Sequence, residues 1–252
     1  MANEPMPPEF ITRADGLRLA VCYRAGNGGK NAPTYIFLPG YMSDMQGGKA
    51  LAVDAWAAKT GKAMLRLDYS GCGMSGGDFA DGTLDVWRDD VLLAIGLLLR
   101  GPVVLIGSSM GGWLMLLVAL ALGDQVKALV GIAAAPDFTR WGFTDAEKGR
   151  IMKYGKIERT SQYSPHPTPT YRALYESGLR HPLLEQPIAI DCPVRLLHGQ
   201  EDPDVPWQIS LKLAAALRSS DVQLHLIKDG DHRLSRDQDI DMLITCLTRL
   251  PV

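Results

Sequence analysis

Six short apolar runs, separated by stretches with helical periodicity, constrain the fold of this chain more than any other feature. They occupy residues 35–38, 63–67, 103–106, 128–132, 194–197 and 222–227. Most are almost continuously apolar, which is typical of strands covered on both faces. An earlier segment differs, because Leu17, Leu19, Val21 and Tyr23 alternate with other residues and predict a strand with one buried face.

Helical periodicity fills the gaps between these runs. Apolar stripes over residues 87–98 and 240–247 have the spacing of a helix face, and Thr83 is a suitable N-cap for the first. Alternation of strands and helices predicts an α/β fold with a mostly parallel central sheet and helices on both faces. In such sheets, ligands bind beyond the carboxyl ends of the strands.

The alternation is interrupted over residues 136–187. Two helix-like pieces, at 144–154 and 170–178, are joined by the Pro-rich stretch 163–171. We identify no strand pattern in this segment. We therefore expect one domain over residues 1–252, with a small cap or lid inserted at 136–187.

The run at 103–106 leads into Gly107-Ser108-Ser109-Met110-Gly111, which fits the pattern G-x-S-x-G. This pattern is typical of a tight strand-to-helix turn that exposes a nucleophilic serine. Ser109 is the central residue, whereas Ser108 comes one position too early. Ser109 is therefore the predicted nucleophile.

A serine hydroxyl needs a base and a third group that orients the base. Carboxylates follow the run at 194–197, where Glu201, Asp202 and Asp204 compete for the orienting role. We favour Asp202, because H-G-x-x-D-x-x-V-P places it on the turn just beyond the strand. His232 follows the last run at 222–227 and is the predicted base.

Four other histidines are weaker candidates for the base: His166, His181, His198 and His225. His225 lies inside a strand pattern, His198 precedes a tight glycine turn, and the other two lie in the inserted segment. We expect all four to be structural or surface residues.

Acyl chemistry also needs backbone N–H groups that stabilise the negative oxygen of the intermediate. The predicted donors are the N–H groups of Met110, next after the nucleophile, and Tyr41, which follows Gly40 after an early strand. The predicted substrate-binding side chains are Met42, Trp141 and Trp207, together with Met45 and Met110. The alternative is that these side chains belong to the plain core, where methionine and tryptophan are more often found.

A glycine pattern at residues 71–76 also matches G-x-G-x-x-G. A dinucleotide site requires a helix that begins at the third glycine, but no helix start is evident before about Thr83. The four cysteines are scattered, with no spacing that suggests a zinc site. We therefore predict no cofactor, no metal site and four free thiols.

The overall charge narrows the class of partner. Among 252 residues the formal net charge is -2, and no basic run is present, so we expect neither nucleic acid nor an anionic membrane as a partner. The longest apolar run, 113–122, is shorter than the ~20 residues that span a bilayer. The start of the chain lacks a signal or transit pattern, which predicts a cytoplasmic protein. We expect its partner to be a small molecule, and the sequence leaves the oligomeric state of the protein open.

Five motifs, in this order, resemble those of the α/β-hydrolase superfamily. They are F-L-P-G-Y-M-S-D-M at 37–45, D-Y-S-G-C-G-M-S at 68–75, G-S-S-M-G-G-W-L-M-L at 107–116, C-P-V-R-L-L-H-G-Q-E-D-P-D-V-P-W at 192–207 and D-H-R at 231–233. They are most similar to the group of mitochondrial acyl-protein thioesterases that also cleave the acyl glucuronide of mycophenolic acid. Two departures are Pro39-Gly40, where many hydrolases have His-Gly, and the missing transit pattern.

The resemblance implies an α/β-hydrolase fold and a serine hydrolase of esters or thioesters, with Ser109, Asp202 and His232 at the triad positions. It leaves the acyl chain and the leaving group open. The alternatives are a perhydrolase, C–C hydrolase or acyltransferase of the same fold, or a non-catalytic ligand-binding protein.

Overall fold

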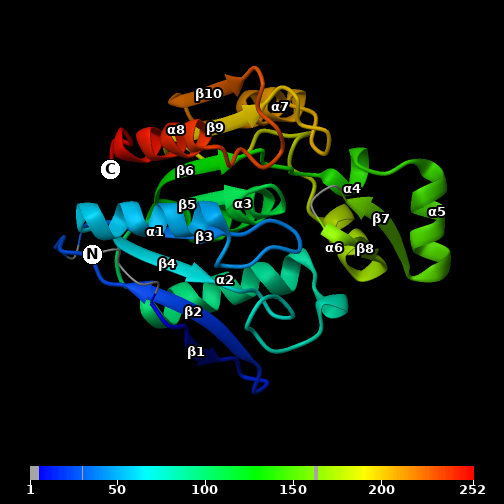
Figure 1. The fold of residues 1–252 in the computed structure, drawn as a ribbon, viewed down its shortest axis with the longest axis horizontal. Coiled ribbons are helices and arrows are strands. Elements are labelled where there is room, and N and C mark those ends of the chain that lie inside the picture. Colours follow the sequence, from blue (N-terminus) through cyan, green and yellow to red (C-terminus); the bar gives the residue numbers. More distant parts are fainter. Residues whose placement is uncertain (1–5, 30, 162–163) are drawn as a thin grey trace.

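The carboxyl ends of the buried strands meet at one end of the sheet in the computed structural model, which describes residues 6–29, 31–161 and 164–252 (Figure 1). Side chains at 161 and 164–166 are outside this description. Within the described residues, the main sheet has eight strands in the order β1-β2-β4-β3-β5-β6-β9-β10. The strands are β1 (Glu9–Thr12), β2 (Arg18–Arg24), β3 (Thr34–Leu38), β4 (Ala63–Leu67), β5 (Val103–Ser108), β6 (Val126–Ile132), β9 (Val194–Gly199) and β10 (Val222–Ile227).

All neighbouring strands from β4 to β10 are parallel, and β2 pairs antiparallel with both β1 and β4. Every residue of β3, β5 and β9 is buried, as their continuous apolar character predicts. The predicted mostly parallel α/β sheet is confirmed. β1 was not anticipated, because its four residues, E-F-I-T, lie mostly exposed at the sheet edge.

Helices cover both faces of this sheet. On one face, α1 (Gly48–Thr60) and α8 (Asp237–Thr248) pack against alternate residues of the central strands, such as Tyr35 and Phe37. On the other face, α2 (Leu84–Leu98), α3 (Met110–Leu122) and α7 (Gln208–Ala216) pack against the intervening residues, such as Ile36 and Leu38. Thr83 caps α2 as predicted, since its hydroxyl accepts a hydrogen bond from the N–H of Val86 at 3.1 Å.

The segment between β6 and β9 projects beyond the carboxyl ends of the strands (Figure 1). Its elements are α4 (Phe138–Trp141), α5 (Asp145–Tyr154), the antiparallel pair β7 (Lys156–Ser161) and β8 (Ser164–Tyr171), and α6 (Arg172–Arg180). The expectation that residues 136–187 contain no strand was therefore wrong. The sequence places proline at 165, 167 and 169 of β8, so the missing N–H groups fall on one edge of a two-stranded hairpin, where proline is tolerated.

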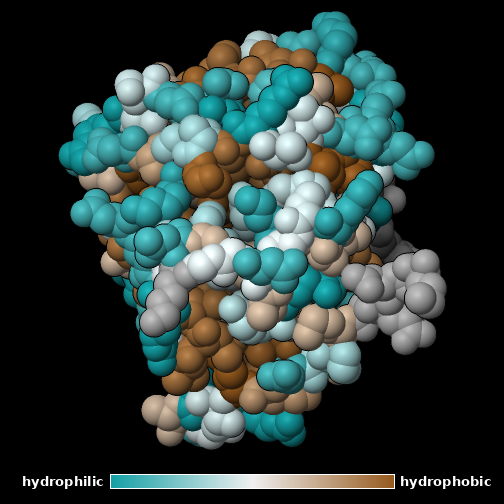
Figure 2. Space-filling view, turned by 90° about the vertical axis from the view of Figure 1, so that its left-hand side faces the viewer, coloured by the Kyte–Doolittle hydropathy of each residue, from teal (hydrophilic) through white to brown (hydrophobic). Residues whose placement is uncertain are grey.

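The opposite end of the sheet faces the viewer in Figure 2, where brown apolar atoms gather on the lower half. An open groove at this end runs beside the last turn of α2 and the starts of β5 and β6. None of the predicted site residues lines this groove, whereas Ser109 and His232 lie at the carboxyl ends of the strands. Two short 3-10 turns, η1 (Phe79–Asp81) and η2 (Gly123–Gln125), complete the described elements.

The described cysteines are all free thiols, and Cys22, Cys72 and Cys246 are buried. Burial raises the pKa of the Cys72 thiol to about 12, so this group stays protonated and inert at neutral pH. No helix in the described ranges is both long enough and apolar enough to cross a membrane.

The β7–β8 hairpin is joined to α5 by an ion pair whose strength depends on pH. Arg159 donates two hydrogen bonds to Glu147, at 2.8 and 2.7 Å. These bonds have the largest effect on the pKa of Glu147, and the hydrogen bond from the backbone N–H of Thr144 has the next largest. Together they lower this pKa to about 2. Because the pKa is lower in the folded protein, the stabilisation is complete above the ordinary pKa of glutamate and is lost as the pH falls towards 2.

We therefore expect amide hydrogen exchange in β7 and α5, corrected for its intrinsic pH dependence, to accelerate as the pH falls from about 4.5 to 2. Glu147→Gln should show the accelerated exchange already at about pH 6, because the amide is uncharged at every pH. Glu176→Gln on α6 is the matched control, since Glu176 lies 3.9 Å from its partner Arg172. Equal exchange in the Glu147→Gln and wild-type proteins at that pH would contradict this assignment.

Candidate active site

Ser109 occupies a strained turn between β5 and α3. Its backbone has φ 54° and ψ -121°, a conformation that residues other than glycine rarely adopt. The strain is held in place by close packing, since a Cβ at Gly107 would overlap Gly111 and a Cβ at Gly111 would overlap the carbonyl oxygens of Leu38 and Pro39. The two glycines of G-x-S-x-G therefore allow the turn to approach the end of β3, and the hydroxyl of Ser109 is left accessible.

His232 lies in the loop after β10 and bridges two of the predicted residues. Its Nε2 is 3.1 Å from the Oγ of Ser109, and its Nδ1 is 2.8 Å from the Oδ2 of Asp202. These three residues come from loops after β5, β9 and β10, which the parallel sheet brings to one end. Since a carboxylate accepts at Nδ1, that nitrogen carries a proton, and Nε2 is the nitrogen that faces the serine hydroxyl.

The carboxylate of Asp202 is buried and fully engaged. Its Oδ1 accepts the N–H groups of Asp204 and Val205, both at 2.8 Å, and its side chain is 1% exposed. Burial raises the pKa of Asp202. Hydrogen bonds from His198 and His232 outweigh this effect and hold the pKa well below its ordinary value. The residue is therefore an anion throughout the neutral pH range.

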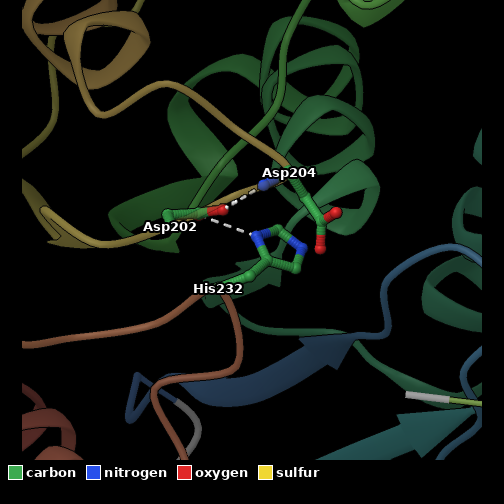
Figure 3. A group of neighbouring side chains, drawn as sticks. All are labelled: Asp202, Asp204 and His232. Atoms are coloured by element: carbon green, nitrogen blue, oxygen red, sulfur yellow. Dashed lines mark hydrogen bonds and ion pairs between the residues drawn. The ribbon is translucent and has the colours of Figure 1, made fainter. Parts of the chain in front are cut away.

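One group of described residues could supply ligand atoms to a metal ion, namely Asp202, Asp204 and His232. One such atom of each residue lies within 4.8 Å of those of the other two. Figure 3 shows the Asp202 carboxylate facing one ring nitrogen of His232, whereas the Asp204 carboxylate lies beside the other edge of the ring. Both oxygens of Asp202 and the Nδ1 of His232 already form hydrogen bonds. These atoms are therefore engaged with one another and with the turn after β9.

The predicted backbone donors flank Ser109. The N–H of Met110 opens α3 and so has no partner within the helix, which makes it available to an oxygen at the helix N-terminus. Tyr41 lies in the loop after β3, beside Gly40, where a Cβ would lie only 3.3 Å from the Cβ of Ser109. Glycine at this position therefore permits the Tyr41 loop to approach the serine closely.

A cleft of about 720 Å³ opens beside Ser109 and His232. Of the predicted pocket residues, Met42, Trp141 and Met110 line it. Met45 is instead fully buried in the small core with Ala20 and Cys22. Trp207 is absent from the lining and immediately precedes α7, two residues beyond Val205, which does line the cleft.

The insertion supplies cleft residues that sequence reasoning missed, namely Phe138, Phe143, Arg159, Thr168 and Thr170. The alternation of threonine with proline at 167–170 is the signal that indicates a strand there. Lys49 at the start of α1 was missed as well. Its ammonium donates to the carbonyl oxygen of Arg233 and lies 3.4 Å from the Oγ of Ser235, which ties α1 to the loop of His232.

Of the remaining candidates, neither His181 nor the glycines at 71–76 line the cleft. His181 bonds to Asp85 at 2.6 Å, as expected of a structural histidine, and the side chain of His166 lies outside the described residues. The glycine pattern at 71–76 forms a closed turn, in which the N–H of Gly71 bonds to the carbonyl oxygen of Gly76 at 2.8 Å. In the same turn the N–H of Met74 bonds to Asp68 at 2.8 Å. The turn itself therefore accounts for these glycines.

Tyr41 links the loop after β3 to the hairpin. Its hydroxyl donates a hydrogen bond to the carbonyl oxygen of Pro169 on β8 at 2.7 Å, and its ring packs against Phe79 with centroids 5.0 Å apart. Tyr41→Phe keeps the ring and removes only the hydrogen bond, so we expect a loss of about 1 kcal/mol of stability and a melting temperature lower by roughly 2–4 °C.

Amide hydrogen exchange in β8 should accelerate in the Tyr41→Phe protein more than exchange in β10, because the lost bond anchors only the hairpin. Tyr69→Phe is the control, since the Tyr69 hydroxyl bonds to Pro39 at 3.0 Å and not to the hairpin. Equal acceleration of β8 in both variants would contradict a specific link.

Comparison with known proteins identifies the family. Residues 54–243 match the model of the prolyl oligopeptidase family. The human protein "Palmitoyl-protein thioesterase ABHD10, mitochondrial" is 41% identical over 241 residues, which cover 93% of this chain and 77% of the human one. The mouse protein of the same name is 41% identical over 247 residues, with 96% and 81% covered. These relatives are named as mitochondrial, which gives no support to the cytoplasmic expectation.

Solved structures agree in fold. A crystal structure of a protein from Agrobacterium vitis S4, described as a hydrolase, has a TM-score of 0.90 and 41% identity, covering 97% of this chain and 98% of that one. The mouse α/β-hydrolase domain-containing protein 10 has a TM-score of 0.88 and 38% identity, covering 96% and 97%. The chain therefore belongs to the α/β-hydrolases and, within them, to the prolyl oligopeptidase family.

Proposed function

We propose that this protein is a serine hydrolase that cleaves carboxylic esters or thioesters through an acyl-enzyme intermediate. The observation that carries the proposal is the pair of contacts of His232, whose ring joins Ser109 at 3.1 Å and Asp202 at 2.8 Å. The 41% identity to relatives named palmitoyl-protein thioesterases over 93% of the chain supports a thioester as the substrate bond.

In the first step, the Oγ of Ser109 attacks the acyl carbonyl carbon while the Nε2 of His232 accepts the hydroxyl proton. Asp202 holds the imidazole through Nδ1 and stabilises its positive charge. The negative oxygen of the tetrahedral intermediate accepts hydrogen bonds from the N–H groups of Tyr41 and Met110. Collapse of the intermediate breaks the bond to the leaving oxygen or sulfur, which takes its proton from His232.

The second step releases the acyl group. Water enters the cleft, gives a proton to the Nε2 of His232 and attacks the carbonyl carbon of the acyl-serine. The second tetrahedral intermediate expels the Oγ of Ser109, which recovers its proton from His232. The products are a carboxylic acid and the free enzyme, so atoms and charge balance over the cycle.

The acyl group lies, in this proposal, against the apolar side of the cleft. Met42 lines it from the loop after β3, and Phe138, Trp141 and Phe143 line it from the insertion. A volume of about 720 Å³ lies within the range of small-molecule sites, which is about 300–1,000 Å³. The inserted segment 136–187 thus acts as a cap that contributes substrate contacts, and its aromatic lining favours a long acyl chain.

The test of the catalytic proposal is Ser109→Ala, assayed on p-nitrophenyl esters, acyl thioesters, acyl glucuronides and a peptide p-nitroanilide. We expect at least a ~10⁴-fold loss of kcat on the substrates that the wild type cleaves, because the nucleophile is removed. Ser108→Ala is the matched control and should retain most activity. Unchanged turnover in Ser109→Ala would disprove the role of Ser109 and favour the non-catalytic alternative.

The substrate panel also separates the enzyme alternatives. A thioesterase should cleave acyl thioesters most efficiently, whereas a peptidase should prefer the p-nitroanilide. An acyltransferase should yield a new ester when an added alcohol competes with water for the acyl-enzyme. Turnover on none of the acyl substrates would contradict the proposed function.

The proposed acyl contact of Trp141 gives a separate prediction. Trp141→Ala removes a large apolar surface from the cleft, while the indole N–H bonds to the carbonyl oxygen of Pro136 at 2.9 Å and helps to hold α4. We expect kcat/KM to fall about 10-fold or more for a long-chain p-nitrophenyl ester and by less than about 3-fold for the acetate.

Trp207→Ala serves as the control, because Trp207 does not line the cleft. Equal losses for the long and the short ester in the Trp141→Ala protein would show that this residue acts on the fold and not on the acyl chain.

A further inference from the structure

A second histidine contacts the carboxylate of Asp202. His198 is the penultimate residue of β9, and its side chain is fully buried. Its position just before the glycine turn at Gly199 predicts a structural role. A buried imidazole requires hydrogen-bond partners for both ring nitrogens, so its contacts reveal what the ring does.

Both ring nitrogens of His198 have partners. Nδ1 lies 2.6 Å from the Oγ of Ser210 on α7, and Nε2 lies 3.0 Å from the carbonyl oxygen of Val205 and 3.2 Å from the Oδ2 of Asp202. Neither a carbonyl oxygen nor an ionised carboxylate has a proton to donate. The proton therefore resides on Nε2 and is shared between these two acceptors, while the hydroxyl of Ser210 donates to Nδ1.

This arrangement completes the set of donors around Asp202. Oδ1 accepts two backbone N–H groups, and Oδ2 accepts one N–H from His232 and one from His198. Four donors fix both the position of the carboxylate and the plane in which it lies. Only the donor from His232 belongs to the reacting unit, so the other three hold Asp202 in place while that imidazole gains and loses a proton.

We propose that His198 is a positioning residue of this hydrolase, which acts through Asp202 and extends the series Ser109–His232–Asp202 to His198 and Ser210. The inference rests on the proposed function. When His232 becomes a cation, it tilts between the serine oxygen and the leaving atom. The Nε2 proton of His198 keeps Oδ2 from following that motion, and it does so without touching the substrate.

Two substitutions of similar polarity separate this role from simple filling of the core. In His198→Gln, the amide N–H₂ takes the place of Nε2 and can donate to both Asp202 and Val205. In His198→Asn, the amide takes the place of Nδ1 and retains only the contact with Ser210. We expect kcat to fall roughly 10- to 100-fold in the Asn variant with KM unchanged, and by less than about 3-fold in the Gln variant.

A spectroscopic measurement reports the same contact directly. In the protonated enzyme, the low-field proton NMR resonance of the hydrogen bond between His232 and Asp202 should persist in His198→Gln and shift or broaden in His198→Asn. His225→Asn on the adjacent strand β10 is the control for the loss of a histidine in this sheet, and it should leave kcat and the resonance unchanged.

Equal kcat values and equal resonances in the Gln and Asn variants would overturn the proposal. If the Asn variant does not fold, Ser210→Ala decides the matter, because it releases Nδ1 and frees the ring to rotate. We expect kcat to fall about 3-fold in that protein, and an unchanged kcat would overturn the proposal. Failure of the proposed function is distinguishable, since Ser109→Ala would then retain turnover whatever residue stands at 198.

Discussion

The strained backbone of Ser109 is the constraint on which the rest of the site depends. A non-glycine residue at φ 54° costs of order 1–3 kcal/mol, and it persists only where the surroundings hold it. Here the holding comes from α3, which is buried through most of its length, and from glycines that allow α3 to touch the end of β3. The same contact brings the Tyr41 loop beside the serine, so the exposure of the hydroxyl and the placement of both proposed N–H donors have one cause.

Asp202 shows how the fold maintains a buried negative charge. An isolated buried carboxylate would take up a proton, whereas this one accepts two backbone and two imidazole N–H groups and keeps its pKa well below the ordinary value. The backbone donors come from the turn after β9, which the pattern H-G-x-x-D-x-x-V-P specifies. The backbone N–H groups of the turn therefore help to keep Asp202 ionised, and the two histidines fix the orientation of its carboxylate.

The sequence predicts the strands that short apolar runs mark, both in the middle of the sheet and at its β10 edge. The runs at 63–67 and 222–227 coincide with β4 and β10. The local motifs, position at strand ends and chain order together select three residues that the structure brings into contact. The hairpin does not follow from the sequence, because a proline-rich stretch is typical of a linker. In the structure the prolines occupy every second position of β8, so their missing N–H groups fall on a free edge. The role of His198 does not follow from the sequence, because its place before a glycine turn predicts a structural residue. Its contact with Asp202 lies four residues on, within that turn, and its ring is held on the other side by Ser210 of α7.

In the proposed mechanism, chemistry and substrate choice reside in different parts of this chain. The residues around the serine come from strand ends, whose positions the sheet determines, whereas much of the apolar lining of the cleft comes from α4 and the segment that follows it. Several contacts connect the two parts, among them the hydrogen bonds of Tyr41 to Pro169, of Trp113 to His181 and of Ser177 to Asp85. Because the insertion has its own small core around Phe143, Ile151, Ile157 and Tyr175, its surface residues can vary without moving Ser109 or His232. A family built in this way can retain one hydrolytic mechanism while the insertion alters which acyl groups reach it.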